Sequence, residues 1–168
     1  MINICEMKDK DIPTVVSFLD NTTEDFMNQW GGMRWYKYPV TIEQMIKVYN
    51  TRKGTTLYFL IKNDDEVIGS FELDFIDWEN SECAVCRFLI ADEYRSKGYG
   101  TQAMKVLVNH AFMHLCMKRI YLSAFDFNIG AIKCYENAGF KKFEEVVRDN
   151  GWVAIRMEIF SPAVKYNQ

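Results

Sequence analysis

One stretch of the chain restricts its fold more than any other. Between residues 88 and 101 an apolar strand runs into a short turn, and the turn opens a helix with apolar residues at helical spacing. The turn contains two cations and two glycines, Arg95, Lys97, Gly98 and Gly100. The first turn of a helix has backbone N–H groups without partners and carries partial positive charge. This order of strand, turn and helix predicts an anion site that suits a phosphate group.

The spacing in this turn, Arg95-x-x-Gly98-x-Gly100, differs from two familiar phosphate-binding patterns. A Walker A loop needs Gly-x-x-x-x-Gly-Lys-Ser/Thr, and the dinucleotide fingerprint needs Gly-x-Gly-x-x-Gly. Glycines here let the backbone adopt unusual dihedral angles and let a pyrophosphate approach closely. The alternative is an ordinary strand-to-helix turn, with glycines for geometry and cations for solubility. A second motif further along the chain favours the phosphate site.

The second motif begins at Asn128, 28 residues after Gly100. It consists of Asn128, Ala131, Tyr135, Glu136, Gly139 and Phe140. Together the two motifs resemble those of the GNAT N-acetyltransferase superfamily, in which the first is the pyrophosphate loop for acyl-coenzyme A. The expected order of elements over nearly the whole chain is also that of the family: strand, helices, hairpin, strand, helix, strand, helix, hairpin. Two motifs in this order are a more specific signal than either one alone.

The residue pattern predicts most of these elements directly. Thr41 followed by Gln44 is a capping box that opens a helix, and Gly139 is a left-handed helix cap. The helix after the phosphate turn has Lys118 and Arg119 at its end, where cations suit the helix dipole. Apolar periodicity predicts strands at 2–7, 55–61, 67–76, 83–90, 120–125, 143–148 and 152–160, and a short helix at 129–138.

The resemblance implies an α/β (α+β) fold in one acyltransferase domain over residues 1–168. Its central sheet would be mixed and mostly antiparallel, with helices on both faces. Two neighbouring parallel strands, here residues 83–90 and 120–125, would splay apart, and the coenzyme would lie in the gap between them.

The same resemblance assigns residues to the coenzyme. The backbone of Phe88 and Ile90 would pair with the pantetheine arm, and the N–H of Leu89 or Ile90 could stabilise the oxyanion of the tetrahedral intermediate. Asn128 would hydrogen-bond the pantetheine, and Lys133 would face the adenosine phosphate end. The pyrophosphate loop would comprise Arg95, Ser96, Lys97, Gly98, Tyr99, Gly100 and Thr101.

Acyl transfer to an amine needs a proton donor for the leaving thiolate and an acceptor for the proton of the amine. The resemblance points the hydroxyl of Tyr135 at the thioester sulfur, although without the motif Tyr135 would read as a core tyrosine. Glu72, Asp74 and Glu82 are candidate bases, acting directly or through water, and each could equally be a solvated strand carboxylate. Glu72 is the first choice among them.

The five cysteines are an odd number and lie in apolar elements, which fits a reducing cytoplasm. Cys83 and Cys86 could form a metal half-site or a redox pair. They lie in a strand, however, no second Cys-x-x-Cys follows, and a zinc site needs four ligands or three plus water. No metal is therefore predicted. Cys86 and Cys134 could form an acyl-enzyme in principle, but most members of the family use direct transfer.

The composition weighs against several other classes of protein. Hydrophobic residues make up 49% of the 168 residues and charged residues 26%, as in soluble globular domains. The net charge of −3 and the pI of about 5.5 argue against broad nucleic-acid binding. There is no apolar run of 18 residues and no signal peptide at the N-terminus, so we expect a cytoplasmic protein without a membrane segment.

These features predict an N-acetyltransferase that moves an acetyl group from acetyl-CoA to a primary amine by direct attack. Polyamines, amino acids, aminoglycosides, other small amines and protein N-termini are candidate acceptors. The aromatic stretch from Phe26 to Tyr38 forms either a wall of the acceptor pocket or a loop packed on the core. Part of it, residues 30–39, faintly resembles the subgroup that acetylates ribosomal-protein N-termini.

The sequence leaves two other functions open. A non-catalytic coenzyme A-binding regulatory module would keep the turn from Arg95 to Gly100 but would not need Tyr135. A structural or interaction protein would bind no nucleotide at all. A homodimer is compatible with the sequence, which carries no interface signal.

Overall fold

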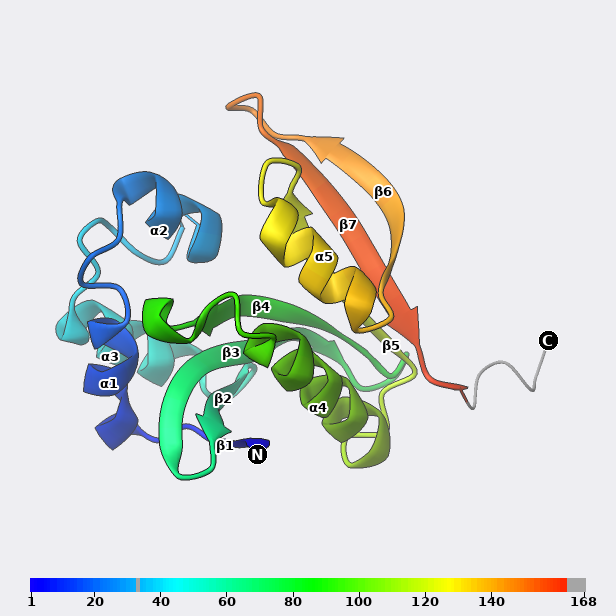
Figure 1. Cartoon of the computed structure of the whole chain (residues 1–168), viewed down its shortest axis with the longest axis horizontal. Coiled ribbons are helices and arrows are strands. Elements are labelled where there is room, and N and C mark those ends of the chain that lie inside the picture. Colours follow the sequence, from blue (N-terminus) through cyan, green and yellow to red (C-terminus); the bar gives the residue numbers. More distant parts are fainter. Residues whose placement is uncertain (33, 163–168) are drawn as a thin grey trace. The chain divides into compact units, whose positions relative to one another are not determined.

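The structure is a computed structural model that describes residues 1–32 and 34–162 (Figure 1). The chain divides into two compact units. The first unit comprises Met1–Asp74 and Cys86–Tyr99, and the second comprises Phe75–Val85 and the chain from Gly100 onward. The single domain expected over residues 1–168 stays a prediction.

The described strands are β1 (Ile2–Glu6), β2 (Leu57–Asn63), β3 (Glu66–Asp77), β4 (Glu82–Ile90), β5 (Arg119–Phe125), β6 (Lys141–Val147) and β7 (Val153–Phe160). They are hydrogen-bonded in the order β1-β2-β3-β4-β5-β7-β6. The pairs β1–β2, β2–β3, β5–β7 and β6–β7 are antiparallel, whereas β4 and β5 are parallel. The predicted mixed, mostly antiparallel sheet is therefore confirmed.

The first unit contains three α-helices, α1 (Ile12–Ser17), α2 (Glu24–Trp30) and α3 (Ile42–Arg52), and two short 3-10 helices, η1 (Asp9–Asp11) and η2 (Asp92–Tyr94). The hydroxyl of Thr41 accepts a hydrogen bond from the backbone N–H of Gln44 at 3.2 Å, which confirms the predicted start of α3. Thr23 caps α2 in the same way. The aromatic stretch thus begins inside a helix and continues as irregular chain.

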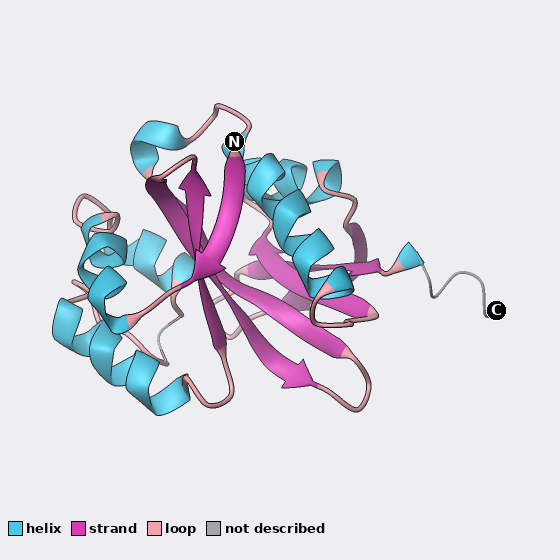
Figure 2. Ribbon diagram, turned by 90° about the horizontal axis from the view of Figure 1, so that it is seen from below, coloured by secondary structure: helices cyan, strands magenta, loops and turns pink. Residues whose placement is uncertain are grey.

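The core of the first unit lies where these helices meet the strands (Figure 2). Apolar residues spaced by three or four along α1 and α3 face inward because this spacing places them on one side of a helix. Tyr36 from the aromatic stretch is only 3% exposed and belongs to the same core. The cluster consists of Met7, Ile12, Val15, Val16, Leu19, Met27, Tyr36, Met45, Val48, Tyr49, Tyr58, Leu60 and Leu89.

The second unit contains helices α4, which spans Tyr99–Met113 and begins at the last residue of the first unit, and α5 (Ile129–Asn137). Alternate residues of β5 are buried opposite buried partners of β7, as in the pair Leu122 and Met157. Gly139 follows α5 with a φ of 104°, so the predicted left-handed cap is confirmed. In the described part of the chain, no helix is both long and apolar enough to cross a membrane.

The predicted end of α4 is wrong. The helix ends at Met113, and Arg119 opens strand β5 instead of facing the helix dipole. Its guanidinium bridges two carboxylates, at 3.0 Å from Glu82 and 2.8 Å from Glu158. Both partners lie on neighbouring strands, so a contact between distant segments determines the role of Arg119.

Candidate active site

The predicted phosphate turn is an exposed connection between η2 and α4. Ser96, Lys97 and Gly98 are exposed, and Ser96 and Gly98 have φ angles of 59° and 79°. A positive φ of this size favours glycine, so the requirement at Gly98 is conformational. α4 has 15 residues and begins immediately after Gly98. The turn therefore fits an anion that would approach the first N–H groups of a long helix.

Arg95 holds this turn in place. Its Nε donates to the carbonyl oxygen of Ile90 at 2.8 Å, and its guanidinium pairs with Asp92 and lies 5.2 Å from the ring centre of Phe26. Lys97 is more exposed and lies 5.7 Å from the ring centre of Tyr94. Arg95 is thus partly committed to the protein itself, whereas Lys97 is the more available cation.

Strand β4 pairs with β5 only over its first residues. Its parallel pairing with β5 covers three residue pairs and ends at Ala84 and Tyr121. Arg87 then has a φ of 49°, which is unusual for a residue with a side chain, although β4 continues through it to Ile90. The predicted pantetheine segment, residues 88–90, lies beyond this point in the first unit. Its middle residue Leu89 is 2% exposed.

The second motif forms helix α5 in the second unit. The side-chain oxygen of Asn128 accepts from the N–H of Ala131 at 3.2 Å, so this asparagine caps the helix. Tyr135 is 8% exposed, with its ring 6.2 Å from that of Phe140. Lys133 is exposed. The core role and the proton-donor role of Tyr135 are compatible, because a buried ring can present a hydroxyl at its far end.

Glu72 and Asp74 project from β3 into a buried cluster of four charges. Arg52 is 6% exposed and places Nη1 3.0 Å from Glu72, while its Nη2 pairs with Asp74. Arg87 places Nη2 2.6 Å from Glu72 and 3.3 Å from Asp74. The two cations balance the two carboxylates. Each carboxylate therefore has cations paired with it inside the protein, as a buried charge requires.

Sequence reasoning found the two carboxylates and missed their partners. Arg52 is the last residue of α3, and Arg87 is the one charged residue in the apolar stretch that follows Glu82 in β4. Buried carboxylates require paired cations, and such an isolated arginine in an apolar strand is the signal that could have found them.

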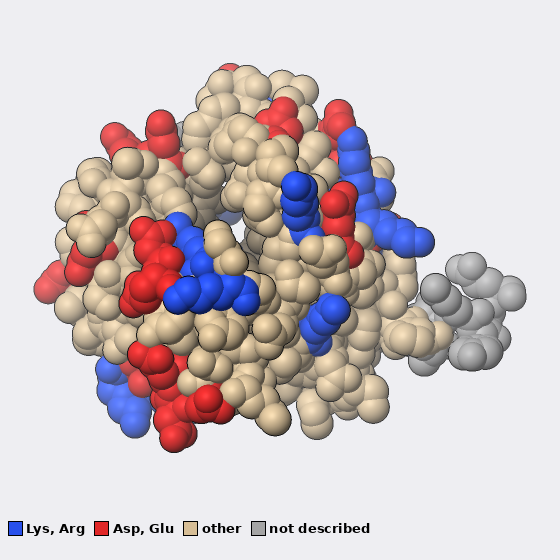
Figure 3. Space-filling view, in the orientation of Figure 1, with Lys and Arg blue, Asp and Glu red and all other residues tan. Residues whose placement is uncertain are grey.

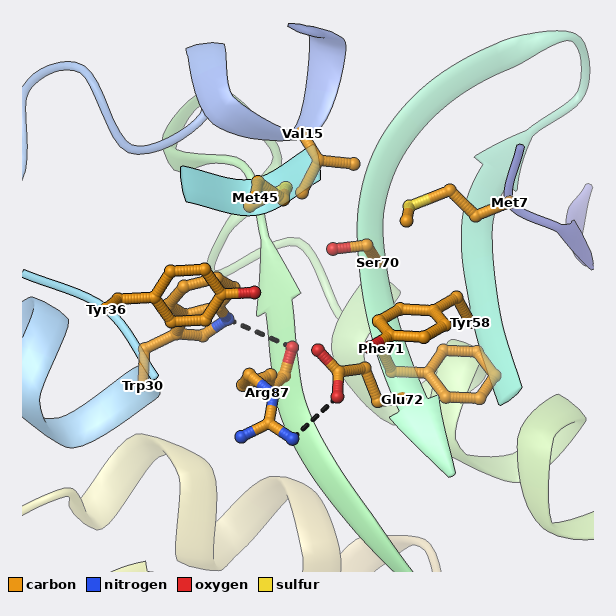
Figure 4. Close-up of a pocket in the computed structure, with 10 residues that line it drawn as sticks. All are labelled: Met7, Val15, Trp30, Tyr36, Met45, Tyr58, Ser70, Phe71, Glu72 and Arg87. Carbon is orange, nitrogen blue, oxygen red and sulfur yellow. Dashed lines mark hydrogen bonds and ion pairs between the residues drawn. The ribbon is translucent and has the colours of Figure 1, made fainter. Parts of the chain in front are cut away.

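A small cavity of about 10 Å³ lies beside this cluster, inside the first unit (Figure 4). Trp30 and Tyr36 line it, and the indole Nε1 of Trp30 donates to the carbonyl oxygen of Arg87 at 3.0 Å. Burial, followed by the charge of Glu72, raises the pKa of Tyr36, so its hydroxyl stays protonated. Described residues of the aromatic stretch therefore pack on the core, and Trp30 and Tyr36 also line this cavity. Its role as a wall of the acceptor pocket stays a prediction.

The cysteines are poor nucleophiles. Burial raises the pKa of the Cys86 thiol to about 12, and burial also raises the pKa of Cys134, opposed by a hydrogen bond with Thr101. The thiolate is the reactive form, so neither cysteine is activated at neutral pH. Among the described residues there is no group of three potential metal ligands. Acidic and basic side chains are intermixed on the face shown in Figure 3.

The mixed sheet with β4 and β5 parallel, the glycine-bearing turn before a long helix and the capped helix α5 are features that the resemblance to the GNAT superfamily implies. Residues 19–140 match the model of the acetyltransferase (GNAT) family, and the chain belongs to this family. Enzymes of the family use acetyl-CoA as the acetyl donor.

Several characterised proteins are similar to parts of this chain. Spermine/spermidine N(1)-acetyltransferase of Bacillus subtilis is 42% identical over 89 residues, which cover 52% of this chain and 51% of that protein. The chain thus spans about half the length of this relative. "Probable N-acetyltransferase YjcK" of B. subtilis is 30% identical over 139 residues, or 79% of this chain and 76% of that protein. The fainter resemblance to ribosomal-protein acetyltransferases is not confirmed.

Solved structures share the fold over nearly the whole chain. Spermidine N-acetyltransferase from Vibrio cholerae, in complex with CoA and spermine, superposes with a TM-score of 0.80 over 95% of each chain, at 19% sequence identity. A dodecameric structure of spermidine N-acetyltransferase from the same organism gives a TM-score of 0.77. At this level of identity the likeness concerns the fold.

Proposed function

We propose that this protein is an acetyl-CoA-dependent N-acetyltransferase that acetylates a primary amine by direct attack. The observation that carries the proposal is the family match over residues 19–140, which includes both motifs up to Phe140. Acetyl-CoA supplies an activated acetyl thioester when bound. The raised thiol pKa values of Cys86 and Cys134 favour direct attack over an acyl-cysteine intermediate.

The coenzyme-binding residues are assigned in each unit separately. In the first unit, the backbone of residues 88–90 binds the pantetheine arm, and Arg95, Ser96, Lys97, Gly98 and Tyr99 begin the pyrophosphate loop. In the second unit, Gly100 and Thr101 complete the loop, Asn128 binds the pantetheine, and Lys133 faces the adenosine phosphate. The exposed turn and the positive φ of Gly98 support this assignment.

Two residues are proposed for the proton transfers. Tyr135 supplies a proton to the leaving thiolate, because a phenol is a suitable acid for this step. Glu72 is proposed as the base that takes the proton of the amine, directly or through water. Glu82, another of the candidate carboxylates, is bound to Arg119 in the second unit.

The acceptor is proposed to be a small amine. The names of the relatives favour a polyamine such as spermidine or spermine, and amino acids and aminoglycosides are the other candidates. We also propose a cytoplasmic location. An oligomeric state is proposed as well, because a protein of the same fold has a dodecameric structure.

Matched glycine variants test the coenzyme site. Gly98→Glu places a carboxylate in the proposed pyrophosphate loop, and Gly151→Glu makes the same substitution at an exposed turn with a φ of 82° in the hairpin of β6 and β7. Acetyl-CoA at 100 times its Kd should stabilise the wild type and Gly151→Glu by about 2.7 kcal/mol in thermal unfolding, and should leave Gly98→Glu unshifted. Equal stabilisation of both variants would remove the turn from the coenzyme site.

Release of coenzyme A with a panel of amines tests the reaction itself. Tyr135→Phe should lower kcat by about 100-fold, the lower end of general acid–base catalysis, while Tyr49→Phe, in α3 outside both motifs and the aromatic stretch, should leave it unchanged. Coenzyme binding without acetylation of any amine would replace the enzyme with the regulatory module. Unchanged turnover in Tyr135→Phe would assign the proton to another donor.

A further inference from the structure

Two buried polar atoms on residues that line the same cavity have no hydrogen-bond partner among the described residues. They are the hydroxyl of Tyr58 and the Nε of Arg87. Tyr58 is 6% exposed, and the side chain of Arg87 is 9% exposed. Native structures rarely leave buried polar groups unpaired, because desolvation without a new hydrogen bond is unfavourable. These atoms therefore mark a place for a polar group from outside the chain.

The cavity has room for about one water-sized group. Its volume of about 10 Å³ is near the minimum that holds a single water. Figure 4 shows the hydroxyls of Tyr36 and Ser70 and the carboxylate of Glu72 pointing toward one another beside Tyr58. Apolar side chains of Met7, Val15 and Met45 close the other side. A ligand could insert one polar heavy atom here and little more.

The charges around the cavity do not favour a cation. Glu72 is the carboxylate that lines it, and one of its oxygens, Oε2, already accepts from both Arg52 and Arg87. The second carboxylate, Asp74, is held by the same two guanidinium groups. The cluster therefore has no net negative charge to offset the desolvation of an ammonium group.

The unpaired atoms distinguish further between an ammonium and a hydroxyl. An Nε–H is a donor only, and an ammonium has three donors and no lone pair, so it cannot accept from Arg87. Burial, followed by the charge of Glu72, raises the pKa of Tyr58, which keeps its hydroxyl neutral and able to donate or accept. A neutral hydroxyl group can accept a hydrogen bond from the Nε–H of Arg87 through a lone pair. It can also donate to the hydroxyl of Tyr58 or accept from it.

We propose that this cavity is the subsite for a distal hydroxyl of the acceptor, so that the preferred acceptors are amino alcohols rather than unsubstituted diamines. The inference rests on the proposed N-acetyltransferase function, and for the acceptor it favours an amino alcohol over the polyamine that the names of the relatives favour. Arg87 directly precedes the segment assigned to the pantetheine, residues 88–90, so the subsite adjoins the proposed coenzyme strand. Tyr58 is then a specificity-determining residue, because its hydroxyl would bind the end of the acceptor that does not react.

Matched acceptors test this assignment. Linear amino alcohols with three to six carbons are compared with diamines of equal length, which differ only in a hydroxyl or an ammonium at the distal end. At the length that fits, kcat/KM for the amino alcohol should exceed that for the diamine by about tenfold, the effect of one hydrogen bond. A diamine preference at every length would overturn the proposal.

Two phenylalanine variants localise the preference. Tyr58→Phe removes the hydroxyl in the cavity and should abolish the preference for amino alcohols over diamines of equal length. Tyr49→Phe is the control, because its ring packs 4.8 Å from that of Tyr58 but its hydroxyl donates to the carbonyl oxygen of Met7 at 3.4 Å. A preference that persists in Tyr58→Phe would overturn the subsite.

Failure of the proposed function has a different signature. In that case no amine of either series releases coenzyme A. Thermal unfolding with the amino alcohols then tests whether they bind in the cavity, independently of any reaction. Stabilisation that Tyr58→Phe loses and Tyr49→Phe retains would support the subsite without the reaction. Absence of stabilisation by every amino alcohol would overturn it.

Discussion

Replacement of Arg52 by methionine is the most informative test of what stabilises the first unit. Arg52 ends α3 and reaches β3, where it pairs with Glu72 and Asp74 and lies 4.8 Å from the ring centre of Trp35. Methionine keeps the unbranched apolar stem and part of the apolar contact but removes the guanidinium and its charge. Glu72 and Asp74 would then share only Arg87, at 2.6 and 3.3 Å.

The expected loss of stability follows from burial. At the 3.0 Å separation of Arg52 and Glu72, the Coulomb attraction is about 5 kcal/mol at an effective dielectric constant of about 20. Removing one partner of a buried ion pair costs about 3–5 kcal/mol, because the other charge stays buried without compensation. A loss of this size lowers Tm by about 6–20 °C in a chain of this length.

The assay is urea unfolding followed by circular dichroism and by tryptophan fluorescence, since agreement between the probes tests two-state behaviour. Arg156→Met is the matched control. Arg156 also pairs with one carboxylate, Glu144, and lies 5.0 Å from an aromatic ring centre, Phe143, but its side chain is 34% exposed. The control should lose about 0.2–1 kcal/mol, the range for exposed pairs.

The comparison of the two variants tests whether the buried charge cluster stabilises the first unit. If Arg52→Met loses no more free energy of unfolding than Arg156→Met, the buried cluster is not a main source of stability. Addition of Asp74→Asn to Arg52→Met should recover part of the loss, because Arg87 would then balance the one carboxylate charge that remains. A double variant whose loss equals the sum of the single losses would show that Arg52 and Asp74 are not coupled.

Three further predictions follow from particular contacts. Gly69→Ala should lose about 1–3 kcal/mol of unfolding free energy and raise KM for acetyl-CoA, because the new Cβ would lie 2.2 Å from the carbonyl oxygen of Leu89. Gly54→Ala is the control in urea unfolding and should keep its stability, because its Cβ would have open space around it. Burial, followed by a neighbouring histidine, lowers the pKa of His110 below 6.5. The unfolded chain then binds a proton more readily, so unfolding free energy should fall as pH drops below about 6.5, and His110→Gln should weaken this dependence in urea titrations. Cys86→Ala should keep its rate of acetyl transfer, since a thiol with a pKa of about 12 supplies no thiolate, and a loss of turnover without unfolding would contradict direct attack.

The sequence determined the features that depend on neighbouring residues. The helix start at Thr41, the left-handed cap at Gly139 and the order of strands and helices were all predicted and are all present. Capping, turn formation and apolar periodicity act over a few residues, so they can be read without the fold. The family resemblance was carried by two motifs of this local kind, each within one turn or helix start.

Only the tertiary structure decided which charges meet and what they enclose. Arg52 and Glu72 are 20 residues apart in sequence, and Arg119 and Glu158 are 39 apart. A side chain at the end of a helix or in an apolar strand finds its partner only when distant strands pair, and no local pattern encodes that pairing. The same holds for the cavity of Tyr58 and Arg87, which exists because α1, α2, α3 and the strands β2, β3 and β4 bury side chains around one point. Local physical chemistry therefore predicted the coenzyme motifs, whereas long-range packing created the buried charges and the proposed acceptor subsite.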